Sequence, residues 1–73
     1  MIVFKQGQKV WVSPDCHGEE CEPPPPDWAK GTSGSVANHD YRDNRSESPN
    51  RYLIEFEDGR SCWVGPDWLG YGD

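Results

Sequence analysis

Apolar and polar residues alternate most regularly between positions 52 and 64, and this period of two predicts a β-hairpin. On the first strand, apolar side chains occupy every second position and acidic side chains separate them, with Leu53 as the one departure. The turn falls at Asp58-Gly59, a pair that favours the positive φ angles of a type I′ turn. We expect the inward side chains to be Tyr52, Ile54, Phe56, Cys62 and Val64, and the outward ones to be Glu55, Glu57, Ser61 and Trp63.

Shorter stretches predict two strands in the N-terminal part of the chain. Residues 2–4 suit a short edge strand, and residues 9–13 alternate as a second strand after a turn at Gly7-Gln8. Pro14 ends the second strand because proline cannot donate a ladder hydrogen bond. The inward side chains of this strand are Val10 and Val12, and its outward one is Trp11.

The rest of the chain adds two short strands and one helical turn. Residues 31–34 predict a turn that leads into a strand over residues 35–38. Residues 66–69 predict a single helical turn, since proline is accepted at the first helical position. Residues 70–73 are expected to add a short last strand, so the pattern as a whole predicts an all-β domain with very little helix.

A polar arm over residues 15–30 interrupts the strands. Its four consecutive prolines, residues 23–26, favour a stiff and extended polyproline conformation. The arm is too polar to be expected in the core, and two interpretations stay open: a solvated surface loop, or an acidic, semi-rigid flap that meets a partner. Residues 40–50 predict a second polar loop with balanced charges. The acidic residues of the arm are Asp15, Glu19, Glu20, Glu22 and Asp27.

Length and composition limit the class of protein. A chain of 73 residues predicts one domain over 1–73, with a small core in which aromatic side chains supply much of the apolar area. No stretch approaches the roughly 20 apolar residues that span a bilayer. The start of the chain lacks the features of a signal peptide, and three cysteines are an odd number for a secreted disulfide framework. We therefore expect unpaired cysteines and a cytoplasmic protein.

The formal net charge of −6 argues against nucleic-acid binding through phosphates, which needs clustered Lys and Arg. It favours a basic protein surface as the partner, although acidity also serves solubility alone. We expect no direct sequence-specific contact with nucleic acid, no membrane association and a monomeric chain.

Few residues are candidates for chemistry. Cys16, His17, Cys21 and Cys62 are the conceivable ligands of a zinc site, but the Cys16-x₄-Cys21 spacing is loose. Cys62 falls at an inward strand position, where a small buried hydrophobe is the preferred interpretation. His39 is a candidate base, yet no Ser, Cys or carboxylate pair stands in a catalytic frame. We expect no enzyme, no metal and no cofactor, with a zinc-stabilised domain left open as an alternative.

Two outward tryptophans, Trp11 and Trp63, are the main candidates for partner contacts, because Trp is enriched at binding hot spots. Two alternatives stay open: the arm folds back and covers one of them, or both join Tyr52 in an aromatic cage for a methylated Lys. The full set of candidate partner-binding residues is Val3, Phe4, Trp11, Trp63, Glu19, Glu20 and Glu22.

The order of these features resembles SH3-like barrels of the Tudor and KOW kind. Residues 7–12 look like the Gly-x-x-Val-x-Val opening of a KOW domain, and residues 31–36 look like its following Gly-x-x-Gly-x-Val. Residues 52–69 are similar to the hairpin and terminal Leu of Tudor-like barrels. The resemblance implies a small five-stranded SH3-like barrel, whose closure hides its edges, with the long acidic arm in place of a short first loop.

KOW domains of NusG-type elongation factors and ribosomal proteins contact RNA, RNA polymerase or other proteins. The negative charge departs from the RNA-binding members, so the resemblance implies protein contact. As a whole, the chain resembles small phage-encoded antitermination proteins that bind host bacterial RNA polymerase. We expect a non-enzymatic regulator of termination, and secondarily of initiation, with polymerase and a NusG-type elongation factor as partners. The alternatives are a Tudor-like reader and a small SH3-like structural subunit of another complex.

Overall fold

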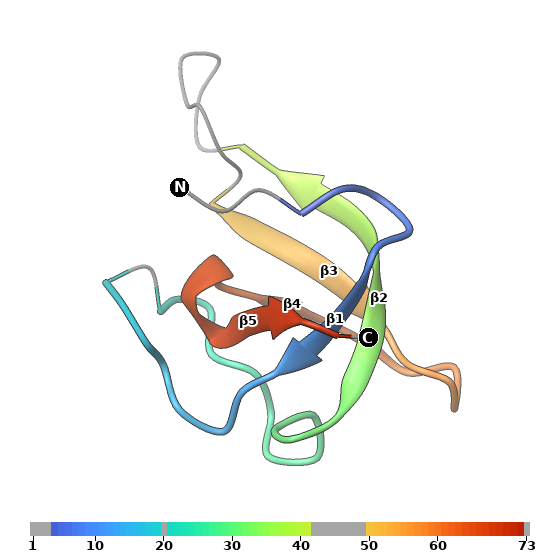
Figure 1. Cartoon of the computed structure of the whole chain (residues 1–73), viewed down its shortest axis with the longest axis horizontal. Helices are drawn as coiled ribbons and strands as arrows, with labels where there is room; N and C mark the ends of the chain where they lie inside the picture. Colours follow the sequence, from blue (N-terminus) through green and yellow to red (C-terminus); the bar gives the residue numbers. More distant parts are fainter. Residues whose placement is uncertain (1–3, 20, 42–49, 73) are drawn as a thin grey trace.

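The computed structural model describes residues 4–19, 21–41 and 50–72. Five antiparallel strands form one sheet in the order β4-β3-β2-β1-β5 (Figure 1). The strands are β1 Lys9–Val12, β2 Ser33–Asp40, β3 Arg51–Glu55, β4 Ser61–Val64 and β5 Leu69–Tyr71, and one 3-10 helix, η1, spans Pro66–Trp68. The β-rich architecture is therefore confirmed. Within the described residues β4 and β5 stand at the two ends of the sheet and do not pair with each other, so the sheet is open.

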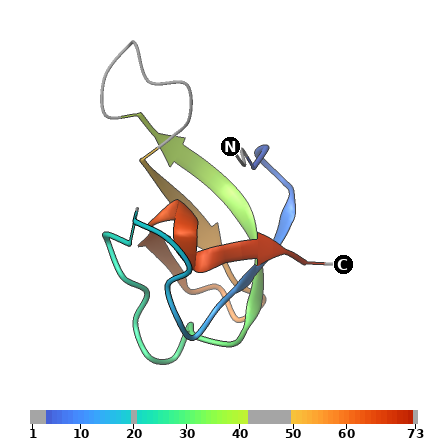
Figure 2. The ribbon, with the colours of Figure 1, turned by 60° about the vertical axis from the view of Figure 1, so that its left-hand side comes forward.

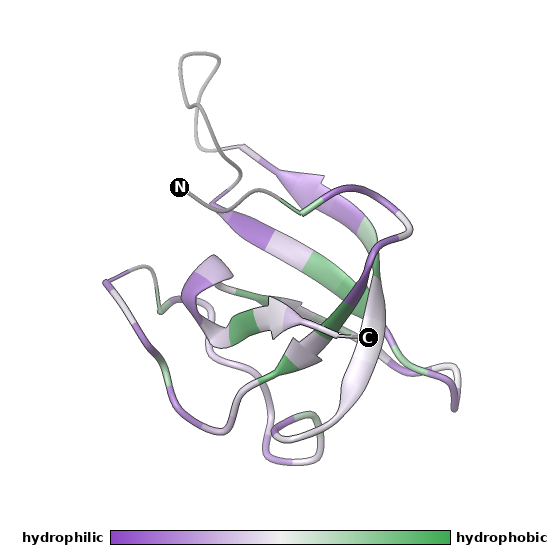
Figure 3. Ribbon diagram, viewed as in Figure 1, coloured by the Kyte–Doolittle hydropathy of each residue, from purple (hydrophilic) through white to green (hydrophobic). Residues whose placement is uncertain are grey.

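The core lies on the inner face of this curved sheet. Strand β2 bends along its length (Figures 1 and 2), and its pairing with β3 is irregular between Val36 and Asn38, as at a β-bulge. The bend turns the inner side chains of the strands toward one another, and the apolar positions recur along β1, β3 and β5 (Figure 3). The buried core residues are Phe4, Val10, Val12, Ala29, Val36, Tyr52, Ile54, Phe56, Val64 and Leu69.

The hairpin of β3 and β4 is confirmed with its predicted faces, but its turn differs from the expected type I′. Gly59 has a φ of 90°, whereas no residue other than glycine has a positive φ in the described part of the chain. The amide of Gly59 donates to the carbonyl of Phe56 at 3.0 Å, and the amide of Phe56 donates to the carbonyl of Arg60 at 2.8 Å. The hairpin therefore closes with a three-residue loop, a type I turn followed by a left-handed glycine.

Strand β1 also has its predicted faces, with Val10 and Val12 fully buried and Trp11 exposed. Strand β2 is longer than the pattern predicted: it begins at Ser33, which pairs with Trp11, so the expected turn over 31–34 is shorter. The turn itself lies at Gly31, which has a φ of 79°. Because β2 continues to Asp40, the polar loop predicted over 40–50 starts later, and its residues 42–49 lie outside the described part of the chain.

The helical turn near the C-terminus is confirmed as η1, one residue shorter than expected. It is followed by β5, which begins at Leu69, one residue earlier than the predicted last strand. Strand β5 pairs with β1, and the amide of Gly72 extends the contact by donating to the carbonyl of Lys9 at 3.2 Å.

The N-terminal expectation needs a correction at Phe4. Residues 1–3, including the candidate Val3, lie outside the described residues, and Phe4 is not part of a strand. The Phe4 side chain is 2% exposed, and its ring packs against Tyr52 and Tyr71 with centroid separations of 5.5 and 5.4 Å. Phe4 was expected to contact a partner, but it is a core residue, and its side chain is not available for such a contact.

The arm also departs from expectation, because part of it packs against the sheet. Ala29 is fully buried and Pro25 is buried, although the arm was expected to be too polar to pack. The amide of Gly65 donates to the carbonyl of Pro23 at 2.8 Å, and the indole Nε1 of Trp68 donates to the carbonyl of Cys21 at 2.6 Å. These bonds tie the arm to the end of β4 and to η1, so the arm is an ordered part of the fold in its described residues.

The cysteines correct a second expectation. Cys16 and Cys21 form a disulfide with their Cα atoms 5.8 Å apart, whereas all three cysteines were expected to be unpaired. Cys62 is free and partly buried. In the described part of the chain, no helix has the length and the apolar character needed to cross a membrane.

Candidate functional site

A hollow of about 510 Å³ lies where the arm meets the adjacent ends of β2 and β3. We call it the arm hollow, and it is lined by Glu22, Pro23, Asp40, Tyr41, Asn50 and Arg51. Asp40 ends β2 and Arg51 begins β3, and the register pairs these two residues across the strands. The amide of Asn50 donates to the carbonyl of Asp40 at 2.9 Å, so the strand ends themselves hold the hollow in shape.

One of the two carboxylates in the arm hollow is paired with a cation, and the other has no partner among the described residues. Arg51 binds the Asp40 carboxylate through Nε at 2.9 Å and through a terminal guanidinium nitrogen at 2.7 Å. The same guanidinium lies over the ring of Trp63, 4.5 Å from its centroid. The carboxylate of Glu22 is exposed and makes no hydrogen bond or ion pair with any described residue. Among the described residues, the hollow therefore presents one carboxylate, that of Glu22, which Arg51 does not pair.

The acceptors that the hollow exposes are carboxylates. The side-chain oxygen Oδ1 of Asn50 also has no hydrogen-bond partner among the described residues, but it is buried and so lies out of reach of a ligand. The exposed acceptors are the carboxylates of Glu22 and Asp40, and Asp40 is paired with Arg51. The ligand group that fits best is therefore a cationic donor such as a Lys or Arg side chain.

The two predicted tryptophans lie on the same outer face of the sheet but do not form one site. Trp11 is 39% exposed and stands opposite Ser33 on β2. Trp63 stands opposite Leu53 on β3, which in turn pairs with Asn38 of β2. Two strands separate the tryptophans across the sheet, a distance of roughly 14 Å at about 4.8 Å per strand. The two tryptophans also lie level with different parts of β2, Ser33 for Trp11 and Asn38 for Trp63. A partner that contacted both would therefore have to span the sheet.

Other predicted residues divide between the arm and regions outside the described chain. Glu19 and Glu22 are both exposed on the arm, and Glu22 and Arg51 both line the arm hollow. Glu20 lies outside the described residues. Arg51 also covers part of Trp63, so Trp63 lies next to the hollow without lining it, and Trp11 lies apart from both.

The predicted aromatic cage is wrong. Tyr52 is fully buried, and its hydroxyl accepts a hydrogen bond from the Phe4 amide at 3.1 Å. A side chain in this position cannot also form one wall of a cage with Trp11 and Trp63. The arm likewise does not cover Trp11, which stays exposed, while Trp63 is partly covered by Arg51.

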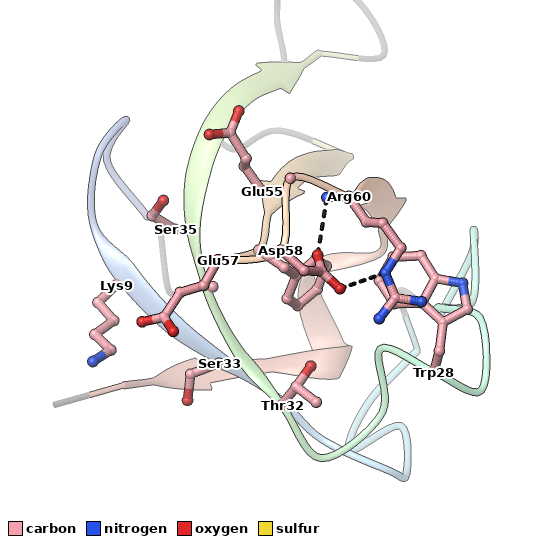
Figure 4. Close-up of a pocket in the computed structure, with 12 residues that line it drawn as sticks. Lys9, Trp28, Thr32, Ser33, Ser35, Glu55, Glu57, Asp58 and Arg60 are labelled. Carbon is pink, nitrogen blue, oxygen red and sulfur yellow. Dashed lines mark hydrogen bonds and ion pairs between the residues drawn. The ribbon is translucent and has the colours of Figure 1, made fainter.

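A larger groove at the opposite end of β2, together with Trp28, was not predicted from the sequence. This groove has a volume of about 790 Å³ and lies between β2, the hairpin loop and the arm (Figure 4). Trp28 of the arm is 37% exposed and closes one end of it. The one available signal was that Trp28 is the only large apolar side chain in a polar arm.

The structure gives the surroundings of several groups that the sequence offered for chemistry; His39 is exposed on β2 and its ring meets that of Tyr41 edge to face at 5.3 Å. The hydroxyl of Ser13 lies 2.8 Å from Nε2 of His17, but Ser13 is buried and also accepts the amide of Asp15. Burial raises the pKa of the Cys62 thiol, which favours its unreactive protonated form. No group of three His, Cys, Asp or Glu that could hold a metal occurs among the described residues, and two of the candidate zinc ligands are joined in the disulfide.

Comparison with known proteins gives no relative to reason from. No protein-family model, no curated protein and no solved structure matches the chain. The site must therefore be interpreted from its own residues.

Proposed function

We propose that the chain is a non-enzymatic interaction module that binds a basic surface of bacterial RNA polymerase. It acts as a phage-type transcription regulator that modulates termination, as an antiterminator, and secondarily initiation. The observation that carries the proposal is the arm hollow, where the exposed Glu22 carboxylate has no hydrogen-bond or ion-pair partner among the described residues. Lys and Arg side chains of a partner protein would supply the missing donors.

The charge and the exposed aromatic surface support a protein partner. The net charge of −6 steers the chain toward positive surfaces and away from phosphate backbones. Trp11 offers a large and exposed apolar ring on the outer face, of the kind that anchors protein interfaces. In this arrangement Trp11, Trp63, Glu19 and Glu22 contact the partner, together with Val3 and Glu20, for which the proposal rests on the sequence.

The choice of polymerase rests on the resemblance to KOW and Tudor barrels. The strand order, the β3–β4 hairpin and the helical turn before β5 are consistent with that resemblance. We therefore extend the proposal to an SH3-like barrel, to a NusG-type elongation factor as an additional partner and to the cytoplasm of the bacterial host.

One observation favours a second candidate function, a Tudor-like reader of methylated cations. Tyr41 is 43% exposed and lines the arm hollow beside Glu22 and Asp40. An aromatic ring next to carboxylates suits a methylated Lys or Arg. In this case a methylated peptide binds the isolated chain more tightly than its unmethylated counterpart does, a preference that the polymerase proposal does not require.

The proposal is tested by capture and by binding kinetics. The immobilised chain is exposed to a bacterial lysate, and we expect retention of polymerase subunits. Surface plasmon resonance on purified core polymerase then compares Glu22→Lys with Asp15→Lys, which makes the same charge change on the arm but away from the hollow. We expect only Glu22→Lys to weaken binding strongly. If no polymerase subunit is retained and the purified enzyme does not bind, the proposal is wrong.

A further inference from the structure

The larger groove, which we call the hairpin groove, runs along the N-terminal half of β2 (Figure 4). One wall is β2 and its approach, and the other wall is the end of β3 with the hairpin loop. Its volume of about 790 Å³ exceeds that of the arm hollow. The lining residues are Lys9, Trp28, Thr32, Ser33, Gly34, Ser35, Glu55, Phe56, Glu57, Asp58, Gly59 and Arg60.

One end of the groove is a preformed aromatic wall. The ring of Trp28 meets that of Phe56 edge to face at 5.3 Å, and the Arg60 guanidinium lies 4.0 Å from the Trp28 centroid. Asp58 fixes Arg60 by accepting its amide at 2.9 Å and its Nε at 2.6 Å (Figure 4). These hydrogen bonds from Arg60 lower the pKa of the Asp58 carboxyl. Both side chains are therefore ionised, and the two charges cancel.

The remaining charges of the groove are unbalanced toward the negative. Glu55 and Glu57 are exposed, and neither carboxylate makes a hydrogen bond or an ion pair with a described residue. Opposite them stands one cation, Lys9, which is also without a partner in the described chain. Ser35 of β2 pairs with Lys9 of β1 on one side and with Glu55 of β3 on the other. Strand β2 therefore lies between the charges of Lys9 and Glu55.

The groove follows a strand, which suits an extended segment as its occupant. It follows residues 33–35 of β2, each of which is paired with β1 on the other side. An extended segment presents alternate side chains to one side about 6.6–6.8 Å apart, so two basic residues in alternate positions can face the two free carboxylates. The apolar stems of Lys and Arg side chains can then lie against Phe56 and the exposed part of Trp28.

We propose that the hairpin groove binds an extended basic segment of a partner protein, with Lys or Arg side chains on Glu55 and Glu57. Charge complementarity selects this occupant, since the uncompensated carboxylates repel nucleic acid and acidic peptides. The inference rests on the proposed function only in taking a protein as the ligand. It adds a second binding site at the opposite end of β2 from the arm hollow.

The test uses a synthetic peptide of alternating Lys and Ser, which is added to the ¹⁵N-labelled chain while amide shifts are followed by NMR. We expect shifts at residues 33–35 and 55–60, and a change in the indole signal of Trp28. The double variant Glu55→Gln/Glu57→Gln should weaken binding about tenfold or more. Lys9→Gln should strengthen it severalfold, a gain that a merely structural role of the groove would not produce.

The matched control is Asp15→Asn/Asp27→Asn, which removes the same charge from exposed arm positions outside both the arm hollow and the hairpin groove and should leave the peptide affinity nearly unchanged. Shifts confined to the arm hollow, or equal losses in both double variants, would overturn the proposal. The outcome is separable from the polymerase test: polymerase retention with an empty groove refutes only this inference, and peptide binding in the groove without polymerase retention refutes only the proposed function.

Discussion

Tyr52 is the residue whose chemistry is most constrained by the fold. Its ring is fully buried, and its hydroxyl accepts the amide of Phe4 at 3.1 Å across 48 positions of sequence. Burial raises the pKa of the Tyr52 phenol above its ordinary value, although the Phe4 hydrogen bond acts in the opposite direction. The hydroxyl therefore anchors the N-terminal segment to the core by accepting the Phe4 amide.

We predict that Tyr52→Phe lowers the free energy of unfolding by about 1–3 kcal/mol, because the buried Phe4 amide loses its acceptor. The pH dependence has a definite sign. In the unfolded chain Tyr52 ionises near pH 10, whereas in the folded chain its raised pKa keeps it neutral, so stability falls as the pH rises above about 10. Urea denaturation across this range should show a smaller alkaline loss in Tyr52→Phe. The exposed Tyr71→Phe is the control, and equal alkaline losses in all three proteins would contradict the assignment.

At the scale of elements, the hairpin loop depends on one backbone conformation. Gly59 has a φ of 90°, and a Cβ there would meet no atom within 4 Å, so conformation alone opposes a side chain. We predict that Gly59→Ala costs about 1–2 kcal/mol, the penalty of a left-handed residue with a Cβ. Gly70→Ala is the matched control, because its Cβ also meets nothing but its φ is not in the left-handed region. Thermal denaturation that shows equal effects of the two substitutions would contradict the loop assignment.

The arm depends on a covalent link that the cysteine count did not suggest. The disulfide between Cys16 and Cys21 closes a short loop beside the contact of Trp68 with the Cys21 carbonyl. By loop-closure entropy, a link over so few residues contributes about 2 kcal/mol. We predict that dithiothreitol lowers the free energy of unfolding by that amount and leaves the sheet folded. Cys16→Ser should abolish this sensitivity while Cys62→Ser keeps it, and identical denaturation midpoints with and without reductant would contradict the pairing.

The elements also show which parts of the fold the sequence can predict. Side-chain faces follow from strand alternation, which is local, so Val10, Val12, Ile54 and Val64 were placed correctly. The packing of the arm depends on contacts with partners more than 40 positions away, such as Gly65 with Pro23. No local pattern encodes such contacts, and the same reason explains why Phe4 was misplaced and Trp28 was overlooked. The arm hollow was therefore predictable only through two of its neighbours, Glu22 and Trp63.

At the scale of the whole molecule, the two candidate binding regions lie at opposite ends of one small sheet. The arm hollow joins the arm to the ends of β2 and β3, whereas the hairpin groove lies along the other end of β2. Trp11 borders the second region because it stands opposite Ser33 of the groove. Trp63 belongs to the first region because Arg51 covers it. The two tryptophans therefore lie beside different candidate regions, and their truncation tests each region separately.

We predict that Trp11→Ala lowers stability and also speeds dissociation from core polymerase. The side chain is 39% exposed, so its covered part should cost about 1–3 kcal/mol of unfolding free energy on truncation. A hot-spot tryptophan contributes about 2 kcal/mol or more to binding, which corresponds to a roughly thirtyfold faster dissociation of the fraction that stays folded. Trp63→Ala should likewise lower both stability and binding, because it removes the surface on which the Arg51 guanidinium rests beside Asp40. Surface plasmon resonance and urea denaturation of both variants measure the two effects separately. If Trp11→Ala leaves the dissociation rate unchanged while polymerase still binds, the outer face of β1 is not part of the interface.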